Sequence, residues 1–524
     1  MIRETLEKNP ELRRFLFRRG FLITDRPVGD TAVHPFYGTW TEHCAGGFHF
    51  YIHPDQTIHI VPNGDAAHFL IGHAYDPFDM LRSESEILTR MSGAHQRCEA
   101  EYVRLLNQLS GVFTVGWARG DSIVFTSDAC GMQSTYYGYV DGAAYIMSST
   151  TMARDLELGV TVDEYIARLV AYRFYRWFGR RLPADRTPYA EFRRAIPNHF
   201  IEMRGAESAK RRFFPTSPVE VCTSDRYPEV VKSVADILSR SMALIGQKFD
   251  RPAISLTGGV DSRTTLASAT GSFEHYSFFS YISSDTERPD AVVAAKLCAQ
   301  LGLPHKEYEI PGDANSLPGQ DAFRELMTWN YGDIGAPNPN DLRKRLFFLR
   351  NDDFETEVKS WASEVGRAYY SKRFLKRTFP ERPTARYLTT LYKVFAQDRR
   401  LARDTDRVFG EFLNAYYGGA EFDLVWWPDL FFWEHGNEAG HGQVITNEHR
   451  VSFDITLPYN NRSLLTLMLT APLSYRIEDR LHRDVIRRCS PILADIEYVT
   501  NVKHTNLRAR LERLYLEVHS RVPF

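Results

Sequence analysis

Apolar residues in the first two hundred positions fall into short runs that are separated by Pro, Asp, Asn and Gly. The runs cover residues 48–53, 57–61, 68–72, 112–117, 122–126 and 144–147. This pattern is typical of short strands joined by turns. Residues 83–108 instead carry apolar positions at helical spacing. The pattern predicts a strand-rich first part, built as a layered antiparallel sheet with a helix.

The pattern changes after residue 225, where longer helical segments alternate with single apolar runs. Helical spacing marks residues 227–249 and 290–301, and strand-like runs cover 252–256, 276–282 and 304–310. Alternating strands and helices predict a parallel α/β unit. Ligands in such sheets bind at the carboxyl ends of the strands, so residues 257–262 and 280–284 should share one rim. Residues 374–412 are helical and rich in Arg and Lys, with acidic interruptions, which predicts a solvated helical lobe.

Composition narrows the class of protein. The chain has 524 residues, too many for one core, so we expect two or three domains. A net charge of −2 gives no basic field that would attract nucleic acid. Six scattered cysteines without a C-x-x-C pair favour a reducing compartment over a disulfide framework or zinc knuckle. No signal-peptide core and no apolar run near about 20 residues is present, so we expect a cytoplasmic protein that does not enter a membrane.

One stretch carries recognisable chemistry, T-G-G-V-D-S at residues 257–262. A strand, two glycines and a helix start make an anion site, because backbone N–H groups point inward and the helix N-terminus is partly positive. Thr257 and Ser262 add hydroxyl donors. A carboxylate beside a phosphate needs a cation between them, so Asp261 is predicted to bind Mg²⁺. The alternative is a tight turn with glycines at positive φ and Asp261 as the N-cap.

This string resembles the S-G-G-x-D-S pyrophosphatase loop (PP-loop) of enzymes that split ATP into AMP and pyrophosphate, with Thr257 in place of Ser. It lacks the G-K-[ST] of the Walker loop. Further segments resemble motifs of the asparagine synthetase family. They are L-S-G-V-F at 109–113, S-D-A-C-G at 127–131, T-Y-Y at 135–137, R-R-A-I-P-N-H at 193–199 and F-D-I-T-L-P-Y-N-N-R at 453–462. The resemblance implies a glutaminase-like (Ntn-type) α+β domain over residues 1–205. An α/β ATP pyrophosphatase domain with an added helical lobe would follow over residues 225–524.

The sequence departs from that family at its N-terminus. The family's glutaminases use an N-terminal Cys whose own α-amine is the base, but position 2 is Ile2. Cys44 is the nearest cysteine, and we expect it to be a small buried apolar residue. The resemblance therefore implies a degenerate domain that does not release ammonia from glutamine, as in β-lactam synthetases and lasso-peptide cyclases.

The resemblance also assigns site residues. ATP would contact Leu256, Thr257, Gly258, Gly259, Asp261 and Ser262, with Ser280 and Tyr281 from the end of the second strand. Residues 359–367 match the family's G-E-G-x-D-E loosely, which makes Glu364 a second Mg²⁺ ligand. The alternative is an ordinary turn capped by Ser363. Arg367 would contact a phosphate or carboxylate, or be a solvated helix arginine. Lys503 would stabilise charge on an acyl-adenylate, or lie on the surface.

Glu434, His435 and Glu438 lie close together in sequence and suggest a metal site. Without a further paired ligand they make a poor zinc site, so we expect a structural or substrate-facing role.

Together these features predict an ATP-dependent synthetase that adenylates a substrate carboxylate and joins it to an amine. The substrates would be small molecules or peptides, in natural-product or polysaccharide modification, with a homodimer or a pathway protein as possible partner. The alternatives are an amidotransferase fed by free ammonia and a non-catalytic relative that only binds nucleotide.

Overall fold

The computed structural model describes residues 2–29, 35–175, 179–312, 319–392, 398–418, 421–498 and 502–521, and its described strands form three sheets. Two six-stranded antiparallel sheets have the orders β10-β8-β9-β1-β3-β2 (sheet A) and β12-β11-β7-β6-β5-β4 (sheet B). The third has the order β15-β14-β13-β16-β17 and is parallel throughout. Antiparallel sheets in the first part and a parallel sheet in the second confirm the class predicted for each part.

Sheets A and B pack face to face. Sheet A contains β1 (Phe21–Thr24), β2 (Thr41–Ala45), β3 (Phe48–Ile52), β8 (Tyr136–Val140), β9 (Ala143–Met147) and β10 (Phe192–Arg194). Sheet B contains β4 (Ile58–Asn63), β5 (Ala66–Tyr75), β6 (Ser110–Arg119), β7 (Ser122–Ser127), β11 (His199–Arg204) and β12 (Glu207–Arg212). Alternate side chains meet between them, as where the Phe50 ring lies 5.2 Å from that of Phe69. Because β12 belongs to sheet B, this unit runs past residue 205, and the predicted division into domains stays a prediction.

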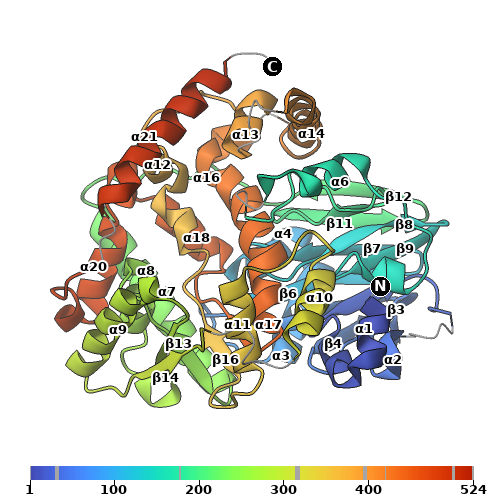
Figure 1. Cartoon of the computed structure of the whole chain (residues 1–524), viewed down its shortest axis with the longest axis horizontal. Helices are drawn as coiled ribbons and strands as arrows, with labels where there is room; N and C mark the ends of the chain where they lie inside the picture. The colour runs from blue at the N-terminus through green and yellow to red at the C-terminus, as the bar shows by residue number, and fades with distance from the viewer. Residues whose placement is uncertain are drawn as a thin grey trace.

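Helices cover the outer faces of this sandwich (Figure 1). On sheet B lie α3 (Glu84–Arg97) and α4 (Glu99–Gln108), which the sequence suggested as one helix over 83–108. Cys98 separates them with an extended backbone. On sheet A lie α1 (Ile2–Lys8) and, from the second part of the chain, α10 (Gln320–Asn330). The short helices here are α2 (Pro35–Gly38), α5 (Met152–Asp155), α6 (Glu164–Ala171) and a 3-10 turn at Pro10–Phe15.

The parallel sheet confirms the elements predicted around the glycine loop. Its strands are β13 (Pro252–Ser255), β14 (Ser277–Ile282), β15 (Lys306–Glu309), β16 (Thr356–Val358) and β17 (Asp454–Thr456). Its helices include α7 (Tyr227–Lys248), α8 (Val260–Ser268), α9 (Arg288–Gln300) and α11 (Pro339–Phe348). The chain moves outward from β13 to β15 and then crosses to β16 on the other side of β13. The strand order therefore reverses between β13 and β16, which is where open α/β sheets bind ligands.

A helical lobe lies above the parallel sheet in Figure 1. It contains α12 (Tyr369–Arg373), α13 (Ala385–Tyr392), α14 (Arg399–Tyr416), α15 (Glu421–Leu424), α16 (Trp427–Phe431), α18 (Arg462–Leu469), α19 (Leu473–Ile477), α20 (Arg480–Cys489) and α21 (Val502–His519). A 15-residue π-helix, Phe432–Thr446, continues from α16 and leads into α17 (Asn447–Arg450). The remaining turns of 3-10 helix are Phe273–His275, Asp285–Glu287, Ser363–Arg367 and Pro491–Leu493. None of the helices in the described ranges is long and apolar enough to cross a membrane.

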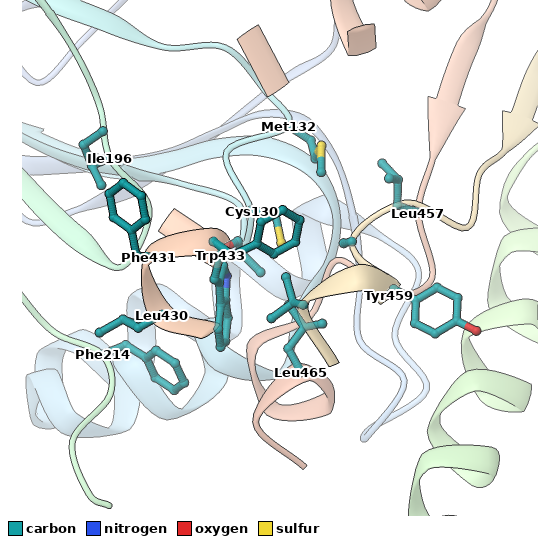
Figure 2. Close-up of a cluster of buried hydrophobic side chains, with 14 of the residues drawn as sticks. Cys130, Met132, Ile196, Phe214, Leu430, Phe431, Trp433, Leu457, Tyr459 and Leu465 are labelled. Atoms are coloured by element: carbon teal, nitrogen blue, oxygen red, sulfur yellow. Dashed lines mark hydrogen bonds between the residues drawn. The ribbon is translucent and has the colours of Figure 1, made fainter. Parts of the chain in front are cut away.

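Two of the apolar clusters contain residues from both parts of the chain. Figure 2 shows Cys130 and Met132 from the loop after β7 close to Trp433 of the π-helix. The Trp433 indole N–H donates to the Ala129 carbonyl at 2.7 Å. A Cβ on Gly442 would lie 2.0 Å from the Gly131 carbonyl oxygen, so only glycine permits this approach. This packing holds the π-helix against the antiparallel sheets.

The cysteines correct one expectation. All six are free. Cys44 is exposed and not buried as predicted, because it lies on β2, the outermost strand of sheet A. Ile2 is buried at 2% exposure within α1.

Candidate active site

The loop between β13 and α8 lies at the reversal of strand order and differs from a simple glycine turn. Gly259 is the N-cap of α8 with φ −77°, and Gly258 likewise avoids the left-handed region. Asp261 is the second residue of the helix. The alternative of positive-φ glycines with Asp261 as the N-cap is therefore wrong. The first N–H groups of α8 have no acceptor within the helix, and α8 begins directly after the loop at the carboxyl end of β13.

Hydrogen bonds fix the shape of this loop. The hydroxyl oxygens of Thr257 and Ser262 are 3.0 Å apart, and Ser262 also donates to the Thr257 carbonyl at 3.1 Å. The Gly258 N–H donates to Asp290 Oδ1 of α9 at 2.8 Å. The structure thus brings together the two hydroxyls predicted from the sequence, and it ties the glycines to the next helix.

The predicted residues of β14 are tied to the same rim. The Ser280 hydroxyl donates to the Leu256 carbonyl at 2.8 Å and lies 3.1 Å from Nε2 of His305. The Tyr281 hydroxyl accepts from Lys359 Nζ at 2.9 Å. Their contact with ATP stays a prediction.

Lys359 is a further candidate site residue, which its sequence pattern does not reveal. It is 6% exposed and follows β16 directly. Besides Tyr281, its ammonium donates to Ser255 Oγ at 3.1 Å and forms an ion pair with Glu357. One cation therefore links the carboxyl ends of β13, β14 and β16. Burial works to lower the pKa of Lys359, but the Glu357 charge leaves it raised, so the cation persists.

Asp261, in the first turn of α8, and Glu364, in the 3-10 turn after β16, lie on the two sides of the reversal, close enough for their charges to interact. Asp261 Oδ1 accepts from Ser363 Oγ at 2.6 Å, and Oδ2 forms an ion pair with Arg367. Glu364 Oε2 is buried and has no hydrogen-bond partner among the described residues. Burial and the Asp261 charge raise the pKa of Glu364 to about 7. A buried carboxylate oxygen without a partner, beside a second carboxylate, fits a divalent cation such as Mg²⁺.

The turn that presents Glu364 has an unusual backbone. It is the 3-10 turn Ser363–Arg367, flanked by Ala362 with φ 73° and Ala368 with φ 50°. Both alanines lie in the left-handed region, which costs a non-glycine residue about 1–3 kcal/mol and is found most often at functional sites. Ser363 gives the turn no side-chain cap, since Ala362 is the N-cap and the serine hydroxyl bonds to Asp261. The capped-turn alternative is therefore wrong.

Arg367 is not a solvated helix arginine. Its guanidinium joins Asp261 to Asp479, with Nε 2.7 Å from Asp479 Oδ1. Lys372 also forms an ion pair with Asp479. Burial lowers the pKa of His482 to about 4, so this ring is neutral at pH 7 and adds no charge although Nε2 lies 3.8 Å from Asp261 Oδ1. Contact between Arg367 and a phosphate stays a prediction.

The π-helix brings polar groups with few partners to the same region. Asn437 is fully buried, and within the described part of the chain its side-chain amide has no polar partner other than the Cys130 thiol. Nδ1 of His441 has no partner among the described residues, and its ring lies 5.3 Å from that of Trp361, next to the Glu364 turn. Buried polar groups are rarely unpaired, and π-helices occur often at functional sites. Three glycines within residues 436–442 were the only signal for this break from α-helix.

Glu434 has the opposite surroundings. Arg212 binds both of its oxygens, at 2.6 and 2.9 Å, and Asn198 and Tyr417 donate to it at 2.9 and 2.8 Å. This network connects β12 to the π-helix. It agrees with the structural role that was weighed against a metal site.

Lys503 belongs to α21, but its side chain lies outside the described residues. Its role at an acyl-adenylate stays a prediction.

Comparisons with known proteins show only distant similarity. No protein-family model and no curated protein matches the chain. Among solved structures, it is similar to glutamine phosphoribosylpyrophosphate amidotransferase from B. subtilis complexed with ADP and GMP, with 10% identity, 50% of this chain and 60% of that one covered, and a TM-score of 0.24. It is also similar to a structure of the allosteric regulatory enzyme of purine biosynthesis, with 9% identity and a TM-score of 0.24. That match covers 58% of this chain and 62% of the other. A third similar structure is glutamine-dependent NAD⁺ synthetase from Acinetobacter baumannii in complex with ADP, with 12% identity and a TM-score of 0.21. That match covers 65% of this chain and 85% of the other. The chain spans little more than 60% of the first two proteins, and TM-scores this low carry no argument about activity.

Proposed function

We propose that the chain is an AMP-forming synthetase that activates a carboxylate with Mg-ATP and joins it to an amine. The observation that carries this proposal is the pair Asp261 and Glu364, which lie on the two sides of the reversal of strand order and interact through their charges, with Glu364 Oε2 buried and unpartnered among the described residues. The PP-loop resemblance at residues 257–262 supplies the reaction class.

The proposed reaction has two steps. An oxygen of the substrate carboxylate attacks the α-phosphorus of ATP, the bond from that phosphorus to the bridging oxygen breaks, and pyrophosphate leaves. The amine nitrogen then attacks the acyl carbon and loses a proton, and AMP leaves with the former carboxylate oxygen. The first step is needed because a free carboxylate is a poor electrophile.

The chain's own residues would act on charge and position. Asp261 and Glu364 would hold Mg²⁺, which offsets charge on the phosphates. The α8 N-terminus and the loop from Thr257 to Ser262 would bind phosphate oxygens. Lys359 places a persistent cation at the same rim, where it would stabilise the developing negative charge. Mg²⁺ would have to share Asp261 with Arg367 or displace it.

The substrate that meets the adenylate would lie against the π-helix. Asn437 offers an amide donor and acceptor, and His441 offers a neutral ring, because burial and the charge of Arg181 lower its pKa to about 4. Such groups recognise a neutral amide, hydroxyl or amine more readily than an isolated charge.

The test is release of AMP and pyrophosphate from Mg-ATP with a panel of carboxylates and amines, with ammonium among the amines. We expect AMP release that depends on both substrates and falls by about 100-fold or more in Asp261→Asn. The exposed Asp225→Asn is the matched control and should retain wild-type rates. Wild-type rates in Asp261→Asn would contradict the proposal.

A nucleotide-binding protein without catalysis is the second candidate. One observation favours it, namely that both oxygens of Asp261 already have partners in Ser363 and Arg367. Calorimetric ATP binding without AMP release from any substrate pair would support this candidate. Activity with ammonium alone as the nitrogen source would instead support an ammonia-fed amidotransferase.

A further inference from the structure

Three side chains of types that bind metals lie close together on the outer face of sheet A. They are away from the reversal of strand order between β13 and β16. Strands β2 and β3 pair in an antiparallel register that places Cys44 opposite His49 and Glu42 opposite Tyr51. Side chains alternate along a strand, so these four residues project from one face of the hairpin. Phe48, Phe50 and Ile52 of β3 face the other way, into the core between the sheets.

The ligand atoms converge on one point. Nδ1 of His49 lies 2.8 Å from Glu42 Oε1 and 3.4 Å from Cys44 Sγ, and the sulfur lies 3.9 Å from the same carboxylate oxygen. Ligand atoms of a tetrahedral Zn²⁺ are roughly 3.4–3.6 Å apart, given metal–ligand bonds of about 2.0–2.3 Å. Shifts of a few tenths of an ångström would therefore place the three atoms at three corners of a tetrahedron.

The same atoms do not form a catalytic relay. A Cys-His-Glu relay needs the thiol on one ring nitrogen and the carboxylate on the other, so that a proton passes through the imidazole. Here Cys44 and Glu42 both contact Nδ1 of His49. Convergence on a single nitrogen is the arrangement of ligands around a shared centre.

Tyr51, on the same face of the hairpin, contacts Glu42 and His49 and holds their side chains in position. Its hydroxyl donates to Glu42 Oε1 at 3.0 Å, and its side chain is 1% exposed and so held in place by the core. The His49 ring stacks over it with centroids 6.5 Å apart and an interplanar angle of 12°. Outer partners of this kind fix ligand orientation before a metal binds. Glu42 and Cys44 are exposed, which leaves access for an ion and for a water as fourth ligand.

We propose that Glu42, Cys44 and His49 form a site for a transition-metal dication of the Zn²⁺ class, with one coordination position open to water. A thiolate and an imidazole select such ions over Mg²⁺ and Ca²⁺, which prefer oxygen ligands. On binding, the Cys44 thiol gives its proton to solvent and the ion replaces the hydrogen bond between His49 and Glu42. The site is separate from the carboxylate pair Asp261 and Glu364, so it does not depend on the proposed function.

The test is a titration of the reduced full-length chain with Co²⁺, which reports a thiolate ligand through charge-transfer absorption in the near ultraviolet. We expect one equivalent to produce this band, Zn²⁺ to abolish it by competition, and a large excess of Mg²⁺ to leave it unchanged. Cys44→Ser should eliminate the band. His49→Ala should weaken binding by more than the roughly 10–100-fold expected for Tyr51→Phe, an outer partner.

The hairpin offers matched controls. His43 lies on the opposite face of the same strand, and Cys98 is an exposed cysteine elsewhere. His43→Ala and Cys98→Ser should bind Co²⁺ as the wild type does. All changes except Tyr51→Phe are at side chains with solvent access, so folding should persist and can be checked by circular dichroism. A band that survives Cys44→Ser, disappears in Cys98→Ser, or never forms in the wild type would overturn the proposal.

Discussion

Glu364 and Glu434 place buried carboxylate oxygens in opposite surroundings. Glu434, at the start of the π-helix, has both oxygens bound by Arg212 and by further donors. Glu364, on the strained turn after β16, has one oxygen without a partner in the described chain and a second carboxylate, Asp261, nearby. Burial acts to raise the pKa of both groups. The ion pair with Arg212 leaves the pKa of Glu434 below its usual value, whereas the pKa of Glu364 rises to about 7.

The difference separates a group that holds the fold from one that we propose binds Mg²⁺. A buried charge is tolerated when its partners are in place, and Glu434 joins the antiparallel sheets to the helical lobe in this way. A carboxylate left without compensation costs stability, and such groups concentrate where function needs them. Glu434 is the more deeply buried of the two residues, yet it is the one whose pKa is lowered, so the pairing of its oxygens decides the difference.

The largest stability effect should come from Glu434→Gln. Removing this charge leaves the buried Arg212 with only the weaker ion pair to Glu421, 4.0 Å away, among its described neighbours, and losing the closer partner typically costs about 3–5 kcal/mol. Urea unfolding followed by tryptophan fluorescence measures the loss. The exposed Glu99→Gln, which also pairs with an arginine, is the matched control and should cost less than about 1 kcal/mol. Equal urea midpoints for Glu434→Gln and wild type would show that Glu434 does not stabilise the fold.

Glu364→Gln should increase the free energy of unfolding above neutral pH, whereas Glu434→Gln should decrease it. An acid whose pKa is higher in the folded than in the unfolded chain stabilises the fold fully below its usual pKa of 4.5, and this stability is lost as pH rises through about 7. At pH 8 the variant should therefore be more stable than wild type, by on the order of 1–3 kcal/mol, with the difference vanishing near pH 4.

Magnesium sharpens this second prediction. Mg²⁺ favours the ionised carboxylate, so it should reduce the pH dependence of wild-type unfolding between pH 5 and 8 and leave Glu364→Gln unaffected. Unfolding midpoints with and without Mg²⁺ at several pH values measure both effects. A variant that keeps the wild-type pH slope would show that Glu364 is not the titrating group.

How much of this was accessible from the sequence depends on whether the determinants are local. Residues 257–262 hold strand, glycines and helix start in one string, so the loop and Asp261 were predicted, and the parallel unit around them was confirmed. The pairing of Glu434 with Arg212 joins positions 222 residues apart, and no local pattern encodes it. Cys44 was expected to be buried from its residue type alone, but its exposure is set by the edge position of β2.

The π-helix was missed for a related reason. Its i→i+5 bonds have no distinctive periodicity, and the glycines that permit it also fit a loop. Lys359 follows a three-residue strand too short to be recognised as buried by its pattern. Sequence therefore located the loop chemistry, whereas tertiary contacts decide which polar side chains remain without partners.

The smallest and most selective effect should come from Asn437→Leu. Because the amide of Asn437 is buried with only the weakly polar Cys130 thiol as a partner in the described chain, an apolar side chain of similar size should leave the free energy of unfolding unchanged or raise it by about 1 kcal/mol. If Asn437 contacts the second substrate, the same change should raise the KM for that substrate by up to about tenfold, with little change in the KM for ATP. Steady-state kinetics of AMP release, beside unfolding of the same variant, measure both. Asn198→Leu is the matched control, since that amide bonds to Glu434 and its loss should lower stability without a selective change in KM. A destabilised Asn437→Leu with unchanged KM would place Asn437 with Glu434 among the residues that hold the fold.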